Sequence, residues 1–285
     1  MRIVIIGSNG QLGSELTGLL GQKYKLVPLT HQQIEIEKLD PARKLLAGLN
    51  PDIIINTAAY HHVLKCEQNP EIAFAVNALG SWNLARIAAE LNCTLVHYST
   101  DYVFDGLKKS PYIEDDKPNP LNVYAVSKLA GEHFIQNYCK KYFILRISGI
   151  YGKVPCRAKG GNFIMTMIKA AAEREVVKVV ADEILTPTPV EQIAGHTEAL
   201  MRTAAYGLYH LTCQGQCSWY EFAAEIFRIL KIKTPLQACQ SSEFPAGVQR
   251  PLYSVLENKN LQALQLDHFT EWPQALQHFL TRQYL

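Results

Sequence analysis

A tyrosine, a lysine and a threonine are spaced so that they could transfer a proton. Tyr124 and Lys128 lie four residues apart in a stretch of helical periodicity, which puts them on one face of a helix. A phenol has a pKa of about 10, and a nearby ammonium group lowers this pKa because it favours the phenolate. Thr100 ends an expected strand and could hydrogen-bond the same substrate oxygen. Together these groups could protonate a carbonyl oxygen while a hydride reaches its carbon.

A glycine-rich loop near the start of the chain could bind the phosphates of a dinucleotide. It runs from Gly7 to Gly13, after an apolar strand at 3–6 and into an amphipathic helix that starts near Gln11. Gly7 allows a tight turn, Gly10 leaves room for a pyrophosphate, and Gly13 lets the helix approach the strand. The helix N-terminus offers backbone N–H groups to the phosphates. A Tyr-x-x-x-Lys pair alone is more often a solvated surface pair, and its place after this loop favours catalysis.

The form of the nicotinamide dinucleotide stays open from the sequence. A carboxylate that binds the ribose 2′-hydroxyl is expected at the end of the second strand, about 20 residues after the loop. The segment 29–33, which includes the candidate cofactor residue Thr30, has neither a carboxylate nor an arginine. Both NADH and NADPH are therefore compatible with this sequence.

Strands and helices alternate along the chain. Short apolar runs typical of buried parallel strands occur at 3–6, 25–29, 52–55, 94–98, 143–147, 176–180 and 208–211. Between them, segments such as 72–91 and 124–138 have apolar residues at helical spacing. This order predicts an α/β fold, a Rossmann-like, doubly wound parallel sheet.

The later part of the chain predicts a second, smaller lobe. We expect residues 1–151 to form the dinucleotide-binding domain, with 176–211 added to it. Residues 152–175 and 212–285 are expected to form an interleaved C-terminal substrate-binding lobe at the carboxyl end of the sheet, where ligands of open α/β sheets bind.

Composition excludes several classes of protein. Lys and Arg number 28 against 26 Asp and Glu, so the formal charge is +2 and does not favour a nucleic-acid partner. No apolar run reaches the roughly 20 residues of a membrane span, and the N-terminus does not have the pattern of a signal peptide. Seven cysteines are expected to be reduced and mostly buried. We expect a cytoplasmic protein without a membrane partner.

Several motifs together resemble the extended short-chain dehydrogenase/reductase family, and within it the dTDP-4-dehydrorhamnose reductase branch. They are GSNGQLG, NTAAY, AFAVNA, STDYVFDG, YAVSK and RPLYSVLEN, and they extend over nearly the whole chain. The resemblance implies an NAD(P)H-dependent reduction of the C4 carbonyl of a dTDP-4-keto-6-deoxyhexose, which would form dTDP-L-rhamnose. It also allows a homodimer and a Mg²⁺ ion at the dimer interface.

The same resemblance implies roles for individual residues. Tyr124 would donate the proton to the C4 oxygen, Lys128 would bind the nicotinamide ribose and lower the pKa of the tyrosine, and Thr100 would polarise the carbonyl. Asp101 would lie near the sugar. The implied cofactor contacts are Gly10, Gln11 and Leu12 at the pyrophosphate, Ala58, Ala59 and Tyr60 along the ribose, and Asn77 near the active-site helix.

The chain departs from the branch where the substrate would bind. His61 and Leu64 stand where a threonine and an aspartate are common, Gly149 where a tryptophan is, and Leu185 where a glycine is. These departures keep two other hypotheses open. One is a reductase or epimerase of a different nucleotide sugar. The other is a non-catalytic regulatory subunit, like the beta subunit of methionine adenosyltransferase.

Other polar residues carry weaker predictions. Arg250, Arg157 and Lys159 are candidates for binding a substrate diphosphate, because guanidinium and ammonium groups pair with phosphate. His61 and His62 are expected to be loop residues, and Cys213 and Cys217 lack a second pair, so we predict no metal site in the chain. We expect Trp219 to pack against the core rather than against a nucleobase.

Overall fold

The computed structural model describes residues 1–156, 160–243 and 247–285. The strands are β1 (Arg2–Ile6), β2 (Lys25–Leu29), β3 (Ile53–Asn56), β4 (Thr94–Thr100), β5 (Tyr142–Ile147), β6 (Ile150–Tyr151), β7 (Val177–Val180), β8 (Ile184–Leu185), β9 (Thr188–Pro189), β10 (Gly207–His210), β11 (Cys217–Ser218) and β12 (Leu236–Cys239). The α-helices are α1 (Gln11–Leu20), α2 (Leu39–Leu49), α3 (Val63–Gln68), α4 (Pro70–Phe74), α5 (Gly80–Glu90), α6 (Val123–Tyr138), α7 (Phe163–Glu173), α8 (Val190–Met201), α9 (Trp219–Leu230), α10 (Lys259–Ala263) and α11 (Trp272–Tyr284). A π-helical turn, η1 (Ala75–Leu79), joins α4 to α5, and η2 (Asp101–Val103) and η3 (Ser241–Glu243) are 3₁₀ turns.

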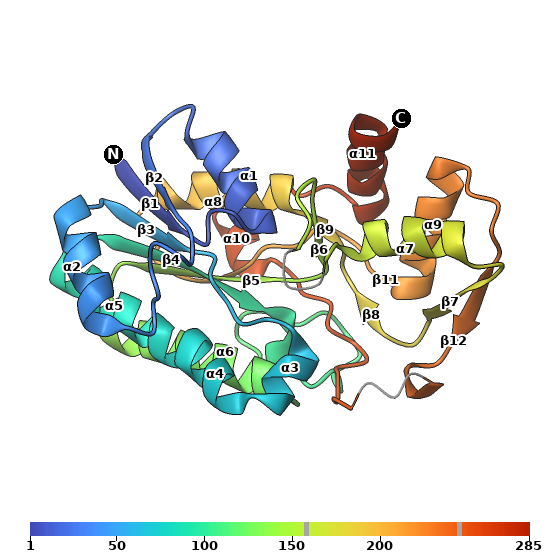
Figure 1. Ribbon diagram of the computed structural model, residues 1–285, viewed down its shortest axis with the longest axis horizontal. Helices are drawn as coiled ribbons and strands as arrows, with labels where there is room; N and C mark the ends of the chain where they lie inside the picture. The colour runs from blue at the N-terminus through green and yellow to red at the C-terminus, as the bar shows by residue number, and fades with distance from the viewer. Residues whose placement is uncertain (157–159, 244–246) are drawn as a thin grey trace.

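Six strands form one parallel sheet in the order β10-β5-β4-β3-β1-β2. Alternate residues of each strand enter different cores. Ile3 and Ile5 pack with α1 and α8 on one face, whereas Val4 and Ile6 pack with α2, α5 and α6 on the other. The sheet is therefore buried on both faces, and the α/β, doubly wound fold predicted from the sequence is confirmed (Figure 1).

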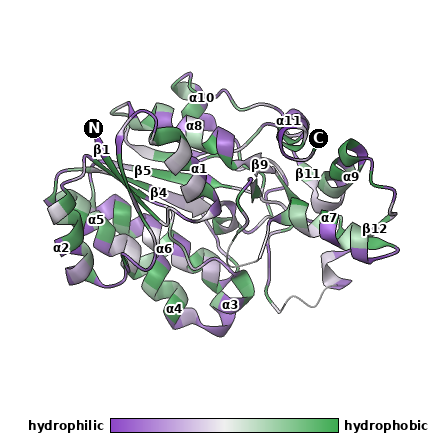
Figure 2. Ribbon diagram, turned by 45° about the horizontal axis from the view of Figure 1, so that its top comes forward, coloured by the Kyte–Doolittle hydropathy of each residue, from purple (hydrophilic) through white to green (hydrophobic). Residues whose placement is uncertain are grey.

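The helices beside the sheet are amphipathic. In Figure 2, α5 and α6 alternate between hydrophobic and hydrophilic residues along their length. The helix expected over 72–91 begins at Pro70 and is interrupted by the π turn η1, and the helix expected over 124–138 begins at Val123. None of the helices in the described part of the chain is long and apolar enough to cross a membrane.

The strand expected over 176–180 forms at Val177–Val180 but does not join the main sheet. It pairs with β12 in a separate two-stranded sheet, and its buried residues pack with α7, α9 and α11 in a core of their own. Lys178 is exposed between two buried valines, so this strand buries only one face. That alternation differs from the strands of the main sheet. The assignment of this segment to the dinucleotide-binding sheet was wrong, and the division into two lobes otherwise stays a prediction.

Candidate active site

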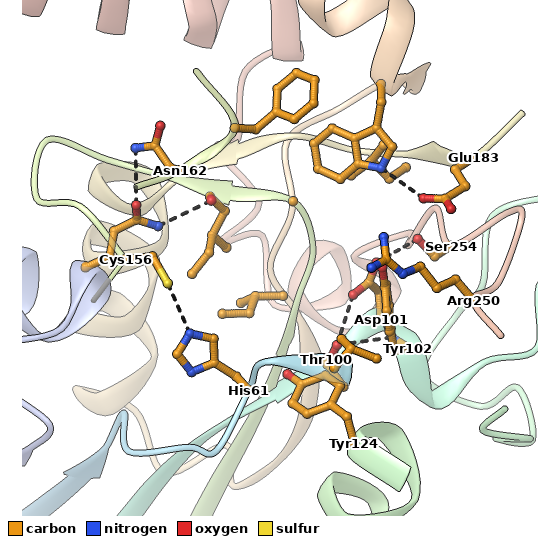
Figure 3. A pocket seen from close by; sticks show the side chains of 18 of the residues that line it. His61, Thr100, Asp101, Tyr102, Tyr124, Cys156, Asn162, Glu183, Arg250 and Ser254 are labelled. Carbon is orange, nitrogen blue, oxygen red and sulfur yellow. Dashed lines mark hydrogen bonds between the residues drawn. The ribbon is translucent and has the colours of Figure 1, made fainter. Parts of the chain in front are cut away.

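A cavity of about 750 Å³ lies at the carboxyl end of the sheet and extends to residues of α7, β7 and α9 (Figure 3). Ten of the predicted site residues line it: Gly10, Gln11, Leu12, Gly13, Ala59, Thr100, Asp101, Tyr124, Lys128 and Arg250. The glycine loop and the Thr, Tyr and Lys residues, far apart in the sequence, therefore face the same space.

Five other predicted residues are absent from this lining. Gly7 makes the turn after β1 with φ of +79°, and Thr30 donates from its N–H and its hydroxyl to Gln33. Asn77 donates to the carbonyl of Tyr60 and accepts from its N–H, both at 2.9 Å, and so fixes the segment that carries Ala58. Asn77 lies in the π turn η1, and such turns often occur at functional sites.

The glycine loop fits a bound pyrophosphate. α1 begins at Gln11 after Gly10, which gives no side-chain cap, so backbone N–H groups are left for a ligand. A Cβ on Gly13 would lie 2.2 Å from the carbonyl oxygen of Gly7, so only glycine allows this approach of helix to strand. Thr57 also lines the cavity beside the loop.

The first turn of α6 is fixed by two side chains. The carbonyl oxygen of the Asn122 side chain accepts from the N–H of Ala125 at 3.0 Å, and Glu67 accepts from the N–H of Val123 at 2.7 Å. Asn122 also donates to the carbonyl of Gln249, which precedes Arg250. These contacts hold the helix turn that carries Tyr124, so its ring lies beside Thr100 (Figure 3).

Burial changes the acid–base behaviour of the site. It raises the pKa of Tyr124, against a smaller effect of the Thr100 hydroxyl, and it lowers the pKa of Lys128 to about 8. A depressed lysine pKa near neutrality is typical of functional lysines. Lys128 Nζ donates to the carbonyl of Tyr98 at 2.6 Å and lies 3.0 Å from Nε2 of His97.

The Asp101 carboxylate is held by three hydroxyl groups, an arrangement that the sequence did not predict. Ser148 donates to Oδ2 at 2.8 Å, Ser254 donates to the same oxygen at 2.6 Å, and Thr100 donates to Oδ1 at 3.0 Å. Burial raises the pKa of this carboxyl, and the three hydrogen bonds oppose that shift. Because a hydroxyl carries one hydrogen, Thr100 presents an acceptor oxygen to the cavity while it donates to Asp101.

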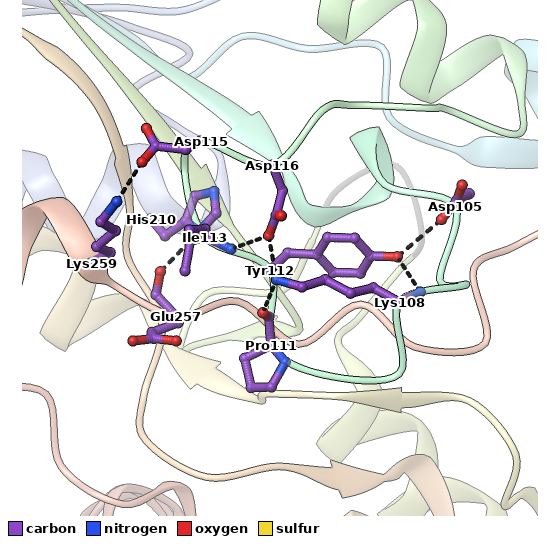
Figure 4. Close-up of polar contacts among 10 residues, drawn as sticks. All are labelled: Asp105, Lys108, Pro111, Tyr112, Ile113, Asp115, Asp116, His210, Glu257 and Lys259. Atoms are coloured by element: carbon purple, nitrogen blue, oxygen red, sulfur yellow. Dashed lines mark hydrogen bonds and ion pairs between the residues drawn. The ribbon is translucent and has the colours of Figure 1, made fainter.

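The chain after η2 is tied to the C-terminal part of the protein. Tyr112 donates from its hydroxyl to Asp105 at 3.0 Å and from its N–H to the carbonyl of Val255 at 2.9 Å. Lys259 forms an ion pair with Asp115 (Figure 4). Because Val255 follows Ser254, this anchorage helps to place the serine that binds Asp101.

The far end of the cavity combines aromatic and charged side chains. Trp219 packs on Phe163, with ring centroids 4.5 Å apart, and its Nε1 donates to Glu183 at 3.2 Å. Trp219 therefore packs against the core and also lines the cavity. Arg250 lines the cavity and lowers the pKa of Glu183, which burial raises. Arg157 and Lys159 lie outside the described residues.

The residues considered for metal binding lie in loops or in the core. His61 lines the cavity and its Nε2 lies 3.1 Å from Sγ of Cys156, whereas His62 caps α3. Cys213 and Cys217 are buried thiols. Within residues 1–156, 160–243 and 247–285, no three His, Cys, Asp or Glu side chains are arranged to hold a metal ion.

Comparison with known families decides the classification. The sequence matches the RmlD substrate binding domain family over residues 1–285. The chain belongs to this family. Relatives named dTDP-4-dehydrorhamnose reductase, which match most of the chain, confirm the resemblance to that branch.

Named relatives cover nearly the whole chain. A dTDP-4-dehydrorhamnose reductase of Escherichia coli (strain K12) is 35% identical over 92% of this chain and 91% of its own length. The spore coat polysaccharide biosynthesis protein SpsK of Bacillus subtilis (strain 168) is 33% identical over 98% of this chain and 96% of its own. A crystal structure of a dTDP-4-dehydrorhamnose reductase from Bacillus anthracis in complex with NADP superimposes with a TM-score of 0.94, at 36% identity and 99% coverage of both chains.

Proposed function

We propose that this chain reduces the C4 carbonyl of dTDP-4-dehydro-L-rhamnose to give dTDP-L-rhamnose. The observation that carries the proposal is the single cavity that the glycine loop shares with Thr100, Tyr124 and Lys128. The names and the coverage of the relatives support the choice of a dTDP-linked 4-keto-6-deoxyhexose. NADPH is the preferred donor in this proposal, because the relative from Bacillus anthracis was crystallised with NADP.

Each residue of the site has a separate role in the proposed reduction. When bound, the nicotinamide supplies a hydride to C4 of the sugar. Tyr124 donates its phenolic proton to the C4 oxygen, and Lys128 in its ammonium form favours the phenolate that forms. When the substrate is bound, the Thr100 hydroxyl turns its hydrogen from Asp101 to the same oxygen and orients it. Asp101, fixed by Ser148 and Ser254, positions the Thr100 hydroxyl.

Cofactor contacts are proposed for residues at two places. Gly7, Gly10, Gln11, Leu12 and Gly13 form the turn and the helix N-terminus that would hold the pyrophosphate. Ala58, Ala59, Tyr60 and Thr30 would lie along the riboses, with Asn77 fixing the backbone of this segment. Arg250 would pair with the substrate diphosphate.

A different nucleotide sugar is the second candidate, and Gly149 and Leu185 favour it. A Cβ on Gly149 would lie 2.7 Å from Cδ1 of Leu185, so the leucine fills the space beside the glycine, and both line the cavity. An aliphatic wall therefore stands where the branch often presents an indole. That change alters the shape of the sugar subsite.

A panel of substrates tests the proposal. NADPH and NADH oxidation is followed at fixed enzyme concentration with dTDP-, UDP- and GDP-linked 4-keto-6-deoxy sugars. Turnover fastest with the dTDP-linked 4-keto sugar supports the proposal, and faster turnover of another nucleotide supports the second candidate. If none is turned over and the chain instead copurifies with a partner enzyme, it is a regulatory subunit.

The proposed assembly and location need separate measurements. We propose a cytoplasmic homodimer, and gel filtration with light scattering tests the oligomeric state. A Mg²⁺ ion at the dimer interface stays a prediction of the resemblance. Activity and molecular mass before and after treatment with a chelator test it.

A further inference from the structure

Beside the proposed proton donor, a chain of buried polar groups ends at Lys128. The backbone N–H of Ala58 donates to Oδ1 of Asn56 at 3.1 Å. Nδ2 of the same amide lies 3.1 Å from Nδ1 of His97, and Nε2 of His97 lies 3.0 Å from Nζ of Lys128. Asn56 and His97 are each 1% exposed and Lys128 is 2% exposed, so water does not compete for these contacts.

The directions of these hydrogen bonds follow from what each group can donate. A backbone N–H only donates, so the Asn56 amide must turn its oxygen to Ala58 and its NH₂ group to His97. Nδ1 of His97 then accepts, and the neutral imidazole carries its hydrogen on Nε2. An Nε2–H group that faces a charged ammonium brings two donors together. An uncharged amine has a lone pair and accepts this hydrogen.

The charge state of His97 supports the same conclusion. Burial and the neighbouring Lys128 lower the pKa of His97 well below its usual range. An imidazolium ion would also lose the hydrogen bond from Asn56, because both of its ring nitrogens are donors. His97 is therefore neutral, with one hydrogen to place.

We propose that His97 is a positioning residue: Asn56 holds it in the Nε2–H form, and this form favours the uncharged amine of Lys128. Lys128 keeps its second contact in either state, since an amine still donates to the carbonyl of Tyr98. The kinetic consequence rests on the proposed reductase function, in which the ammonium form of Lys128 favours the phenolate and the uncharged amine does not. Deprotonation of Lys128 then sets the alkaline limit of activity. The protonation states themselves do not.

The other charged groups near Lys128 do not override this effect. Glu132, one turn along α6, raises the pKa of Lys128. However, Glu132 accepts hydrogen bonds from Arg146 at 3.0 and 2.7 Å and another from Ser99, so its charge is largely compensated. Burial still lowers the pKa of Lys128 to about 8.

Titratable groups at the cavity and around Tyr124 are biased toward their neutral forms. On α6 and η2, burial raises the pKa of Tyr124 and of Asp101. On α3, burial raises the pKa of the Cys66 thiol to about 11. Among these neutral side chains, His97 is the one whose ring nitrogen contacts Lys128 Nζ.

A direct test reads the histidine tautomer. ¹⁵N chemical shifts of histidine-labelled protein distinguish protonated from unprotonated ring nitrogens, and the His97 signals are those lost in His97→Gln. We expect the Nε2–H form throughout the range in which Lys128 titrates. In Asn56→Asp, the new carboxylate accepts from Nδ1, so the hydrogen should move to Nδ1. An Nδ1–H form or an imidazolium in the parent protein overturns the proposal.

A kinetic test separates this role from packing. In His97→Gln the amide can turn its oxygen to Lys128 and accept from the ammonium, so the alkaline limb of kcat/KM should move up by about one pH unit. His210→Gln is the matched control, because His210 is equally buried on β10 but its Nδ1 contacts the carbonyl of Glu257 rather than Lys128. An unchanged limb in folded His97→Gln overturns the proposal. Absence of turnover in the parent protein would contradict the proposed function. The ¹⁵N experiment would still test the tautomer of His97, because it does not depend on activity.

Discussion

Cδ1 of Leu185 lies 2.7 Å from the position that a Cβ on Gly149 would take. The two residues are 36 positions apart in sequence, yet each occupies the space that the other leaves. Gly149 also has φ of +53°, a conformation that residues with a Cβ rarely adopt. The two departures from the family pattern are thus a single, matched change in the wall of the cavity.

This match predicts coupling between the two positions. Gly149→Ala should destabilise the protein by about 1–3 kcal/mol, because it adds backbone strain and a clash. Leu185→Ala in the same chain should recover the part of the loss due to the clash, about 1 kcal/mol. Urea unfolding of the parent, both single variants and the double variant measures this coupling. Strictly additive losses would show that the contact carries no energy.

Removal of the proposed proton donor should stop catalysis without unfolding the protein. Tyr124→Phe should lower kcat by about 10²-fold or more, because general acid catalysis is lost. Tyr209→Phe is the control, since that hydroxyl donates to the carbonyl of Ala205 away from the cavity. Rates of NADPH oxidation with the dTDP-linked 4-keto sugar give the comparison. Equal rates for Tyr124→Phe and the parent would assign the proton to another group.

The hydrogen bond from Thr100 to Asp101 predicts different results for two substitutions of the aspartate. In Asp101→Asn the amide oxygen can accept from Ser148 and Ser254 while its NH₂ donates to Thr100, which frees the threonine hydrogen for the substrate. We expect kcat within about tenfold of the parent, the equivalent of one ordinary hydrogen bond.

Asp101→Ala should behave differently, because it leaves two buried serine hydroxyls without their acceptor. We expect a loss of about 1–3 kcal/mol in the free energy of unfolding and a larger fall in kcat. Thermal unfolding and initial rates measure both effects. Asparagine and alanine variants with the same kcat would contradict this role of Asp101.

Substitutions of two loop glycines should have different effects, one on the affinity for NADPH and the other on the stability of the fold. A Cβ on Gly10 would meet only the Gly7 carbonyl, at 3.3 Å, so Gly10→Ala should fold normally. It should bind NADPH at least about tenfold more weakly, because its methyl group faces the pyrophosphate. Gly13→Ala places a Cβ 2.2 Å from the same backbone oxygen and should cost about 1–3 kcal/mol of stability.

Fluorescence titration with NADPH and urea unfolding of both variants test this separation. Unchanged affinity in folded Gly10→Ala would mean that the pyrophosphate does not contact this residue.

Local sequence alone determined the strands of the main sheet and the residues proposed for the reaction. Runs such as Ile3–Ile6 are apolar throughout, which suits strands that are buried on both faces, and six of the seven expected strands join that sheet. Tyr124 and Lys128 could be placed on one helix face because residues four positions apart in an α-helix lie on the same side. The glycine loop could likewise be predicted from the spacing of its glycines between a strand and a helix.

Tertiary structure alone decided which distant residues complete the site. Ser148 and Ser254 meet Asp101, and Asn56 and His97 meet Lys128, through pairings of strands and loops up to 153 positions apart. Periodicity does not encode such contacts, because it reports the face of an element and not its neighbour. The strand at Val177–Val180 left the main sheet for the same reason, since its partner β12 lies about 60 residues further along the chain.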